Sequence, residues 1–217
     1  MNNNALKHID TLIERYPQLA SLKEEIIKSV DIIIKAYENQ NKIMVCGNGG
    51  SAADSLHIVG ELMKAFILPR KLTKEIKNAL EKTSANPKYL QENLQMAMPA
   101  ISLVNEVGLL TAYANDVAPD LNFAQQVLGQ GKKGDILIAI STSGNSENVL
   151  YATEVAKAME IKTIALTGQT GGKLKDLADI TLNVPEKETY KIQELHLPVY
   201  HAICLALEAH FYTQTEA

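Results

Sequence analysis

The segment "LIAISTSGNSENVL" (residues 137–150) joins an apolar run of strand type to a helix through a polar loop. Five side chains of this loop can donate hydrogen bonds: Ser141, Thr142, Ser143, Asn145 and Ser146. A helix N-cap needs only one such residue, so the alternative that Ser146 or Asn145 merely caps the helix leaves the others unexplained. Helix N-termini offer unpaired N–H groups and a positive dipole end, and the loop therefore favours a bound phosphate.

Strands and helices alternate on both sides of this loop. Apolar strands are expected at 42–47, 100–104, 134–140, 162–168 and 178–184, and helices at 4–16, 20–39, 51–66, around 119–128, 146–159 and 189–212. Strands that are apolar throughout, rather than at alternate positions, are typical of a parallel sheet covered on both faces. The pattern predicts one α/β domain over residues 1–217 that binds ligands beyond the carboxyl ends of its strands.

Composition narrows the class of protein. A chain of 217 residues with 46% apolar residues suits one globular domain. The net charge of −4 argues against a non-specific nucleic-acid binder, although it leaves small anions open. No apolar run could span a bilayer and the N-terminus has no secretory pattern, so we expect a cytoplasmic protein without membrane contact. Cys46 and Cys204 lie among apolar residues and are expected to be buried free thiols.

A second loop, "GNGGSA" (47–52), matches the G-x-G-x-x-[GA] dinucleotide fingerprint. That fingerprint also requires an acidic residue about 20 positions later, at the end of the next strand. The chain has "FILPRKL" there, which contains no acid and leads into a polar segment. A nucleotide site, a plain glycine-rich turn and a second phosphate-type loop therefore all stay open for this stretch.

Two helices carry residues suited to catalysis or metal binding. His57 and Glu61 share a helix face because they are four positions apart, and Gln193 and His201 can line one side of the last helix. A His/Glu pair that faces a Gln/His pair can bind a divalent metal or act as general base and acid. Each pair alone is more often structural. Pro198 should kink the last helix.

The polar segment 68–98 interrupts the pattern. It is expected to hold two short helices packed as a flap or an oligomer contact, and a solvated insertion without function is the alternative. Its position after the helix of His57 and Glu61 places it near the expected reaction centre.

Four stretches, "CGNGGSAADSLHIVGEL" (46–62), "AISTSGNSENVL" (139–150), "ALTGQTGGKL" (165–174) and "YKIQELHLPVYH" (190–201), together resemble the sugar isomerase (SIS) domain family and its phosphoheptose isomerase branch. The resemblance covers residues 20–212 apart from 68–98. It implies a three-layer α/β/α fold of flavodoxin or Rossmann type with a five-stranded parallel sheet, and a homotetramer with sites at subunit interfaces. The implied reaction converts sedoheptulose 7-phosphate to D-glycero-D-manno-heptose 7-phosphate by enediol proton transfer.

The same resemblance assigns roles to individual residues. Glu61 would be the base and His201 the acid/base partner, while zinc would bind His57, Glu61, Gln193 and His201. The substrate would be held by Asn48, Gly49, Gly50, Ser51, Asn115, Asp116, Ser141, Thr142, Ser143, Ser146 and Gln193.

Some features depart from the isomerase pattern. An arginine expected after the Glu-Leu pair is replaced by Ala65, and a Ser/Thr-Asp pair appears as Asn105-Glu106. These changes bear on the choice of sugar phosphate. Alternatives within the family are a binding protein of the kind that associates with a replication initiator, which lacks the catalytic Glu and His, and a regulator with a DNA-binding module. The chain keeps Glu61 and His201, and the segment before residue 42 is too short for such a module.

Overall fold

The computed structural model describes residues 1–213 and contains one parallel sheet. Its strands are β1 (Ile43–Gly47), β2 (Ala100–Ser102), β3 (Ile136–Ile140), β4 (Lys162–Thr167) and β5 (Ile180–Asn183), in the order β2-β1-β3-β4-β5. All four pairings are parallel. The predicted five-stranded parallel α/β fold is therefore confirmed. Residues 214–217, the end of the predicted single domain, lie outside the described residues.

The sheet is buried on both faces because its central strands are apolar throughout. Side chains of a strand point alternately to opposite faces. In β1, Ile43 and Val45 pack into one apolar core, and Met44 and Cys46 pack into the other. A strand covered on both faces cannot alternate apolar with polar residues, which is why the apolar runs predict this architecture.

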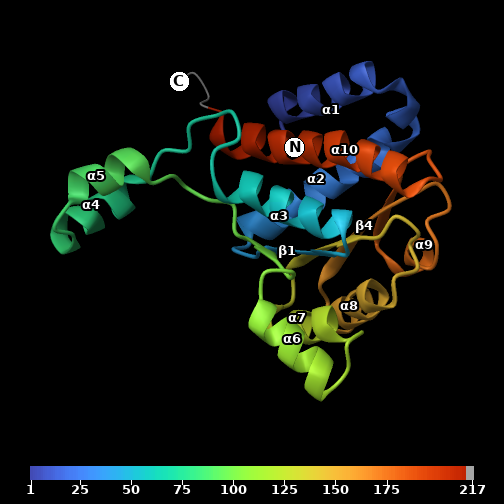
Figure 1. The fold of residues 1–217 in the computed structure, drawn as a ribbon. Helices are drawn as coiled ribbons and strands as arrows, with labels where there is room; N and C mark the ends of the chain where they lie inside the picture. Colours follow the sequence, from blue (N-terminus) through green and yellow to red (C-terminus); the bar gives the residue numbers. More distant parts are fainter. Residues whose placement is uncertain (214–217) are drawn as a thin grey trace.

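Helices form the outer two layers (Figure 1). One core lies under α1 (Asn3–Arg15), α2 (Lys23–Glu38), α3 (Gly50–Met63) and α10 (Thr189–Tyr212), with a 3₁₀ turn at Pro17–Leu22. The other core lies under α6 (Val107–Asp116), α7 (Asn122–Gln130), α8 (Glu147–Ala158) and α9 (Leu174–Leu177). This arrangement confirms the three-layer prediction.

Two helix predictions need correction. The helix expected around 119–128 begins at Asn122, and α6 before it has no counterpart in the prediction. No residue of α6 is fully buried, so the helix lacks the apolar stripe that reveals a helix in a sequence. The helix expected over 51–66 ends at Met63. Helix α10 continues through Pro198, and the kink predicted there stays a prediction.

The segment 68–98 contains two short helices, as predicted, α4 (Lys74–Thr83) and α5 (Pro87–Asn93). Gln91 joins them, because its Nε2 donates to the carbonyl of Lys77 at 3.1 Å and to Glu81 Oε1 at 2.8 Å. Neither helix has a buried residue. Figure 1 shows the pair projecting from the body rather than folded over it. Within one chain it is therefore an arm and not a flap. None of the helices described in residues 1–213 is long and apolar enough to cross a membrane.

Candidate active site

The two polar loops lie side by side because β1 and β3 are neighbours in the sheet. Gly47, the last residue of β1, is paired with Ile140, the last residue of β3. The side-chain amides of Asn48 and Asn148 join the loops by reciprocal hydrogen bonds of 2.8 and 2.9 Å. Asn148 lies in the quoted stretch 139–150 but was given no role from the sequence, and only the register of β1 against β3 reveals its contact with Asn48.

The Ser/Thr loop is held by its backbone, which leaves hydroxyl groups available. Gly144 has a φ of 67°, and a Cβ there would lie 1.9 Å from the carbonyl oxygen of Gly171, so only glycine fits. Ser146 is the N-cap residue of α8 but makes no side-chain capping bond. Its Oγ lies 3.0 Å from that of the buried Ser141. Simple capping therefore does not account for the serines, and two hydroxyls converge at the start of α8.

The glycine loop connects β1 to α3 in a tightly packed turn. Gly49 has a φ of 56°, a conformation that favours glycine. A Cβ on Gly50 would lie 2.4 Å from Nε2 of Gln193, so this amide rests directly on the first turn of α3. Ser51, in that turn, is buried. At the end of β2, where a dinucleotide site has its acid, the chain has Ser102, hydrogen-bonded to α3. The structure thus disfavours the nucleotide interpretation.

Helices α3 and α10 run side by side in the same direction. Gln193 touches the start of α3 at Gly50, and two turns further His201 meets His57. The Nε2 atoms of His57 and His201 are 3.4 Å apart, and His57 Nε2 is also 3.4 Å from Oε1 of Glu61. Two of the other predicted ligands, Glu61 and His201, therefore both lie next to His57. Gln193 lies apart from them, at the glycine loop.

A hydrogen-bonded relay behind His57 escaped the sequence prediction. The hydroxyl of Tyr200 lies 2.9 Å from His57 Nδ1 and donates to Oδ1 of Asp54 at 3.3 Å. Because the hydroxyl proton goes to Asp54, the phenol oxygen can accept a hydrogen bond from Nδ1–H of His57. Burial, followed by the charge of Asp54, raises the pKa of Tyr200, so the phenol stays protonated. In the sequence, the spacing of Asp54 and His57 on one helix was the feature that could have indicated a shared hydrogen-bond partner.

The protonation of His201 suits a proton shuttle. Burial lowers the pKa of His201 below its ordinary value, the charge of His57 lowers this pKa further, and Glu61 opposes both. The imidazole is therefore neutral at neutral pH, with one N–H donor and one acceptor nitrogen. Glu61 is held by Lys64, whose Nζ lies 2.7 Å from Oε2. Lys64 is 59% exposed, so this ion pair contributes little to stability.

Other predicted or polar residues lie elsewhere. Asn115 and Asp116 are exposed at the end of α6, in the opposite helix layer, and hydrogen-bond each other at 2.8 Å. His196 is structural, because it is buried with Nε2 3.2 Å from the carbonyl of Thr167, and burial lowers its pKa to about 4. Cys46 and Cys204 are free and buried, as predicted, and burial raises the pKa of both thiols to about 12.

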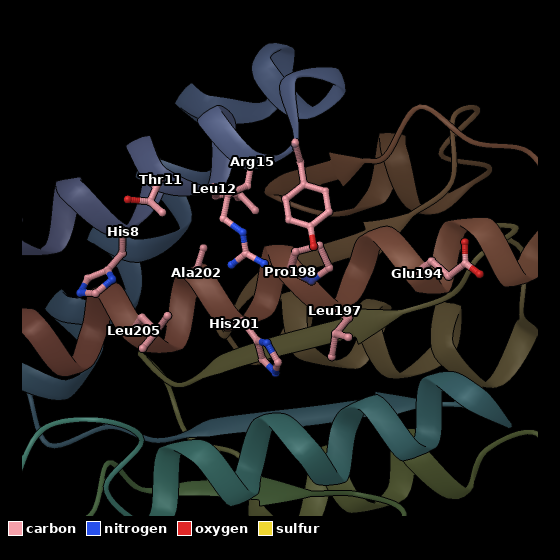
Figure 2. A pocket seen from close by; sticks show the side chains of 11 residues that line it. His8, Thr11, Leu12, Arg15, Glu194, Leu197, Pro198, His201, Ala202 and Leu205 are labelled. Carbon is pink, nitrogen blue, oxygen red and sulfur yellow. The ribbon is translucent and has the colours of Figure 1, made fainter.

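A cavity of about 250 Å³ lies between α1 and α10 (Figure 2). It adjoins the cluster formed by His57, Glu61 and His201, because His201 is one of its lining residues. Arg15, His8 and Glu194 are polar residues of its lining, and Leu197 and Leu205 are apolar ones. Figure 2 shows the ring of His201 directed away from this cavity, toward α3. The imidazole therefore serves the α3 side, where the two polar loops also lie.

Comparison with known proteins agrees with this geometry. A family model described as SIS domain matches residues 7–168. The phosphoheptose isomerase of Helicobacter pylori (strain ATCC 700392 / 26695) is 42% identical over 193 residues, which are 89% of this chain and 88% of that relative. The phosphoheptose isomerase of a Nitratiruptor species is 41% identical over 211 residues, 95% of this chain and 100% of the relative.

Solved structures give the same result. The phosphoheptose isomerase of Neisseria gonorrhoeae superposes with a TM-score of 0.72 at 31% identity, covering 94% of this chain and 96% of that one. The enzyme of Francisella tularensis gives 0.71 at 32% identity, covering 93% and 95%. The chain belongs to the SIS domain family and, within it, to the phosphoheptose isomerase branch.

Proposed function

We propose that this chain is a phosphosugar aldose–ketose isomerase that converts sedoheptulose 7-phosphate to D-glycero-D-manno-heptose 7-phosphate. The observation that carries the proposal is the meeting of Glu61 and His201 around His57, beside two loops suited to phosphate. The relatives at 41–42% identity bear the name phosphoheptose isomerase, which supports the same reaction.

The layout suits a substrate with its phosphate at one end and its carbonyl at the other. Ser51 lies in the first turn of α3, and His57 lies six residues further, about 9 Å along the helix axis. The phosphate would be bound by Ser51 and by the hydroxyls of Ser141, Thr142, Ser143 and Ser146. The reacting carbons would then reach Glu61. A sugar with several carbons between phosphate and carbonyl fits this separation.

Two groups of the chain can perform the reaction. The carboxylate of Glu61 removes a proton from the carbon next to the carbonyl and returns it to the neighbouring carbon of the enediol. His201 moves a proton between the two oxygens of that intermediate, and its neutral imidazole can both give and take one. The reaction is internally balanced, because no atom or electron is gained or lost.

The cluster also suits zinc, which we propose as the metal. Imidazole nitrogen and carboxylate oxygen are usual zinc ligands, and in a tetrahedral site with bonds of about 2.0–2.1 Å neighbouring ligand atoms lie about 3.3 Å apart. Both contacts of His57 Nε2, at 3.4 Å, have this spacing. Zinc would polarise the carbonyl oxygen of the sugar.

Two observations define what zinc binding would require. In residues 1–213, no group of three or more His, Cys, Asp or Glu is closed around a common centre. Zinc binding would therefore require a side-chain rearrangement around His57, whose two contacts at 3.4 Å already have the spacing of zinc ligands. Gln193 rests on Gly50 and would have to change rotamer to become the fourth ligand. A metal-free hydrogen-bonded cluster is the alternative.

Assembly and location complete the proposal. We propose a homotetramer with sites at subunit interfaces, in the cytoplasm and without nucleic-acid or membrane partners. The position of Asn115 and Asp116, on the layer opposite His57, supports this, because these predicted substrate residues would serve a neighbouring subunit. The exposed Val107 and Val117, both 65% exposed at the ends of α6, support an interface there.

The test is turnover of ketose phosphates of five to seven carbons by the purified protein, with aldose product detected by NMR. Sedoheptulose 7-phosphate should react fastest, and Glu61→Gln is the matched inactive control. Turnover of another ketose phosphate alone would change the substrate but keep the reaction. Absence of turnover on every sugar, with and without added zinc, would refute the enzyme and favour a non-catalytic binding protein of this fold.

A further inference from the structure

A buried ion pair lies beneath the catalytic cluster. Arg70 follows α3 and Glu208 belongs to α10, and the side chains of both are 0% exposed. Arg70 Nε donates to Glu208 Oε1 at 2.8 Å. Burial of two charges is costly unless both are fully hydrogen-bonded, so the remaining partners of each group decide what the pair does.

Glu208 holds the backbone that leaves α3. Its carboxylate accepts N–H groups from Phe66 at 2.7 Å, Ile67 at 2.8 Å and Leu68 at 3.0 Å. Burial acts to raise the pKa of Glu208, but these N–H groups and Arg70 outweigh it and lower the pKa. The carboxylate is therefore ionised at neutral pH and fixes three consecutive residues to α10.

Arg70 holds the last turn of α3. Its Nη1 donates to the carbonyl of Leu62 at 2.6 Å, and its Nη2 donates to the carbonyl of Glu61 at 2.9 Å. The last carbonyls of a helix have no partner within the helix, and a cation there also suits the helix dipole. One guanidinium thus binds Glu208 and the backbone of the proposed catalytic base.

The pair joins the C-terminal parts of the two helices that carry the reaction centre. Glu208 is seven residues after His201, two turns along nearly the same face of α10. The chain that follows the arm is attached to the last turn of α3 as well, because the N–H of Met98 donates to the carbonyl of Leu62 at 3.0 Å. The end of α3 therefore has its position relative to α10 set here.

We propose that the Arg70–Glu208 pair is a positioning device that sets Glu61 against His57 and His201 for proton transfer. The proposal rests on the isomerase function. Arg70 and Glu208 touch no reacting atom and act through the backbone of Glu61. A misplacement of about 1 Å in a catalytic group can lower the rate about 100-fold, so this backbone attachment bears directly on turnover.

The test compares two double variants. Arg70→Met with Glu208→Gln removes both charges and keeps an amide oxygen for the N–H groups of residues 66–68. The matched control is Lys42→Met with Asp135→Asn, which neutralises a second ion pair. Asp135 has a 0% exposed side chain and lies just before the N-terminal end of the central strand β3, opposite the end that carries the polar loops. Both variants should lose some thermal stability.

Kinetics and crystal structures give separate readouts. In the Arg70/Glu208 variant we expect kcat to fall at least tenfold and KM to change less than threefold, because the phosphate loops are untouched. Its crystal structure should show the Glu61 carboxylate moved by about 1 Å from the 3.4 Å spacing to His57. The control should keep kcat within twofold. If the double variant fails to fold, Arg70→Lys replaces it, since a compact ammonium lacks the planar fork that reaches Glu208 and both backbone carbonyls.

Different outcomes would overturn different claims. If the wild type turns over no ketose phosphate, the proposed function fails, and the crystal structures alone decide the positioning role. If the wild type is active and the Arg70/Glu208 variant keeps its kcat or the Glu61 spacing, the positioning role is wrong. An equal loss of kcat in the control would show general destabilisation and would also overturn it.

Discussion

Removal of the Tyr200 hydroxyl tests how the reaction centre is oriented. Tyr200→Phe deletes the contact of 2.9 Å to His57 Nδ1 and the bond of 3.3 Å to Asp54, and keeps the ring. The imidazole of His57 then loses the partner that selects its tautomer and ring position. His57 is the residue that both Glu61 and His201 contact, so the effect reaches the proton-transfer groups.

The size of the effect follows from the kind of contact. Loss of a partner that orients a metal-binding histidine costs about 10- to 100-fold in activity or metal affinity. That range is about 1.4–2.7 kcal/mol. The fold should suffer less, because Asp54 is only partly buried and water can replace the phenol on Oδ1. We therefore expect a lower kcat/KM with a small change in melting temperature.

Three measurements check this expectation. They are kcat/KM with sedoheptulose 7-phosphate, zinc affinity by competition with a coloured chelator, and histidine nitrogen NMR of the metal-free protein. The NMR spectrum should show His57 protonated at Nδ1 in the wild type and a tautomer mixture in the variant. Tyr190→Phe, at a 60% exposed position of α10, is the control. A Tyr200→Phe protein with unchanged tautomer, zinc affinity and kcat/KM would refute the relay.

Three further changes have defined outcomes. Glu61→Gln should lower kcat about 10²–10⁴-fold and leave phosphate binding intact, and near-normal turnover would mean that the base lies elsewhere. His196 has a pKa of about 4 in the folded chain against the ordinary 6.5, so the unfolded chain binds more protons and stability falls as pH drops from 6.5 to 4. His196→Gln should remove up to about 3 kcal/mol of that fall in denaturant titrations, and an unchanged pH dependence would contradict this. Replacement of residues 74–93 by a short linker should alter KM or sugar preference if the arm reaches a neighbouring site. Unchanged kinetics would show that the arm is a solvated insertion without function. Loss of the oligomer in light scattering would show that the arm is an assembly element.

The architecture and the chemistry-bearing loops were readable from local sequence. Strands such as "ILIAI" are buried at every position, and a strand in the middle of a parallel sheet has no polar face to show. The glycine and serine loops follow directly after such strands, and their residue types reveal them. His57 and Glu61 share one helix, so their proximity follows from helix geometry alone.

Tertiary structure decided the contacts between separate elements. Asn48 meets Asn148 only through the register of β1 and β3, and Tyr200 meets His57 only because α10 packs alongside α3. Helix α6 escaped prediction because no residue of it is fully buried, and the burial of Arg70 and Glu208 was equally hidden, since charged residues are ordinarily exposed. Local sequence encodes the periods and turns of single elements, whereas a contact between residues a hundred or more positions apart depends on how all the elements pack.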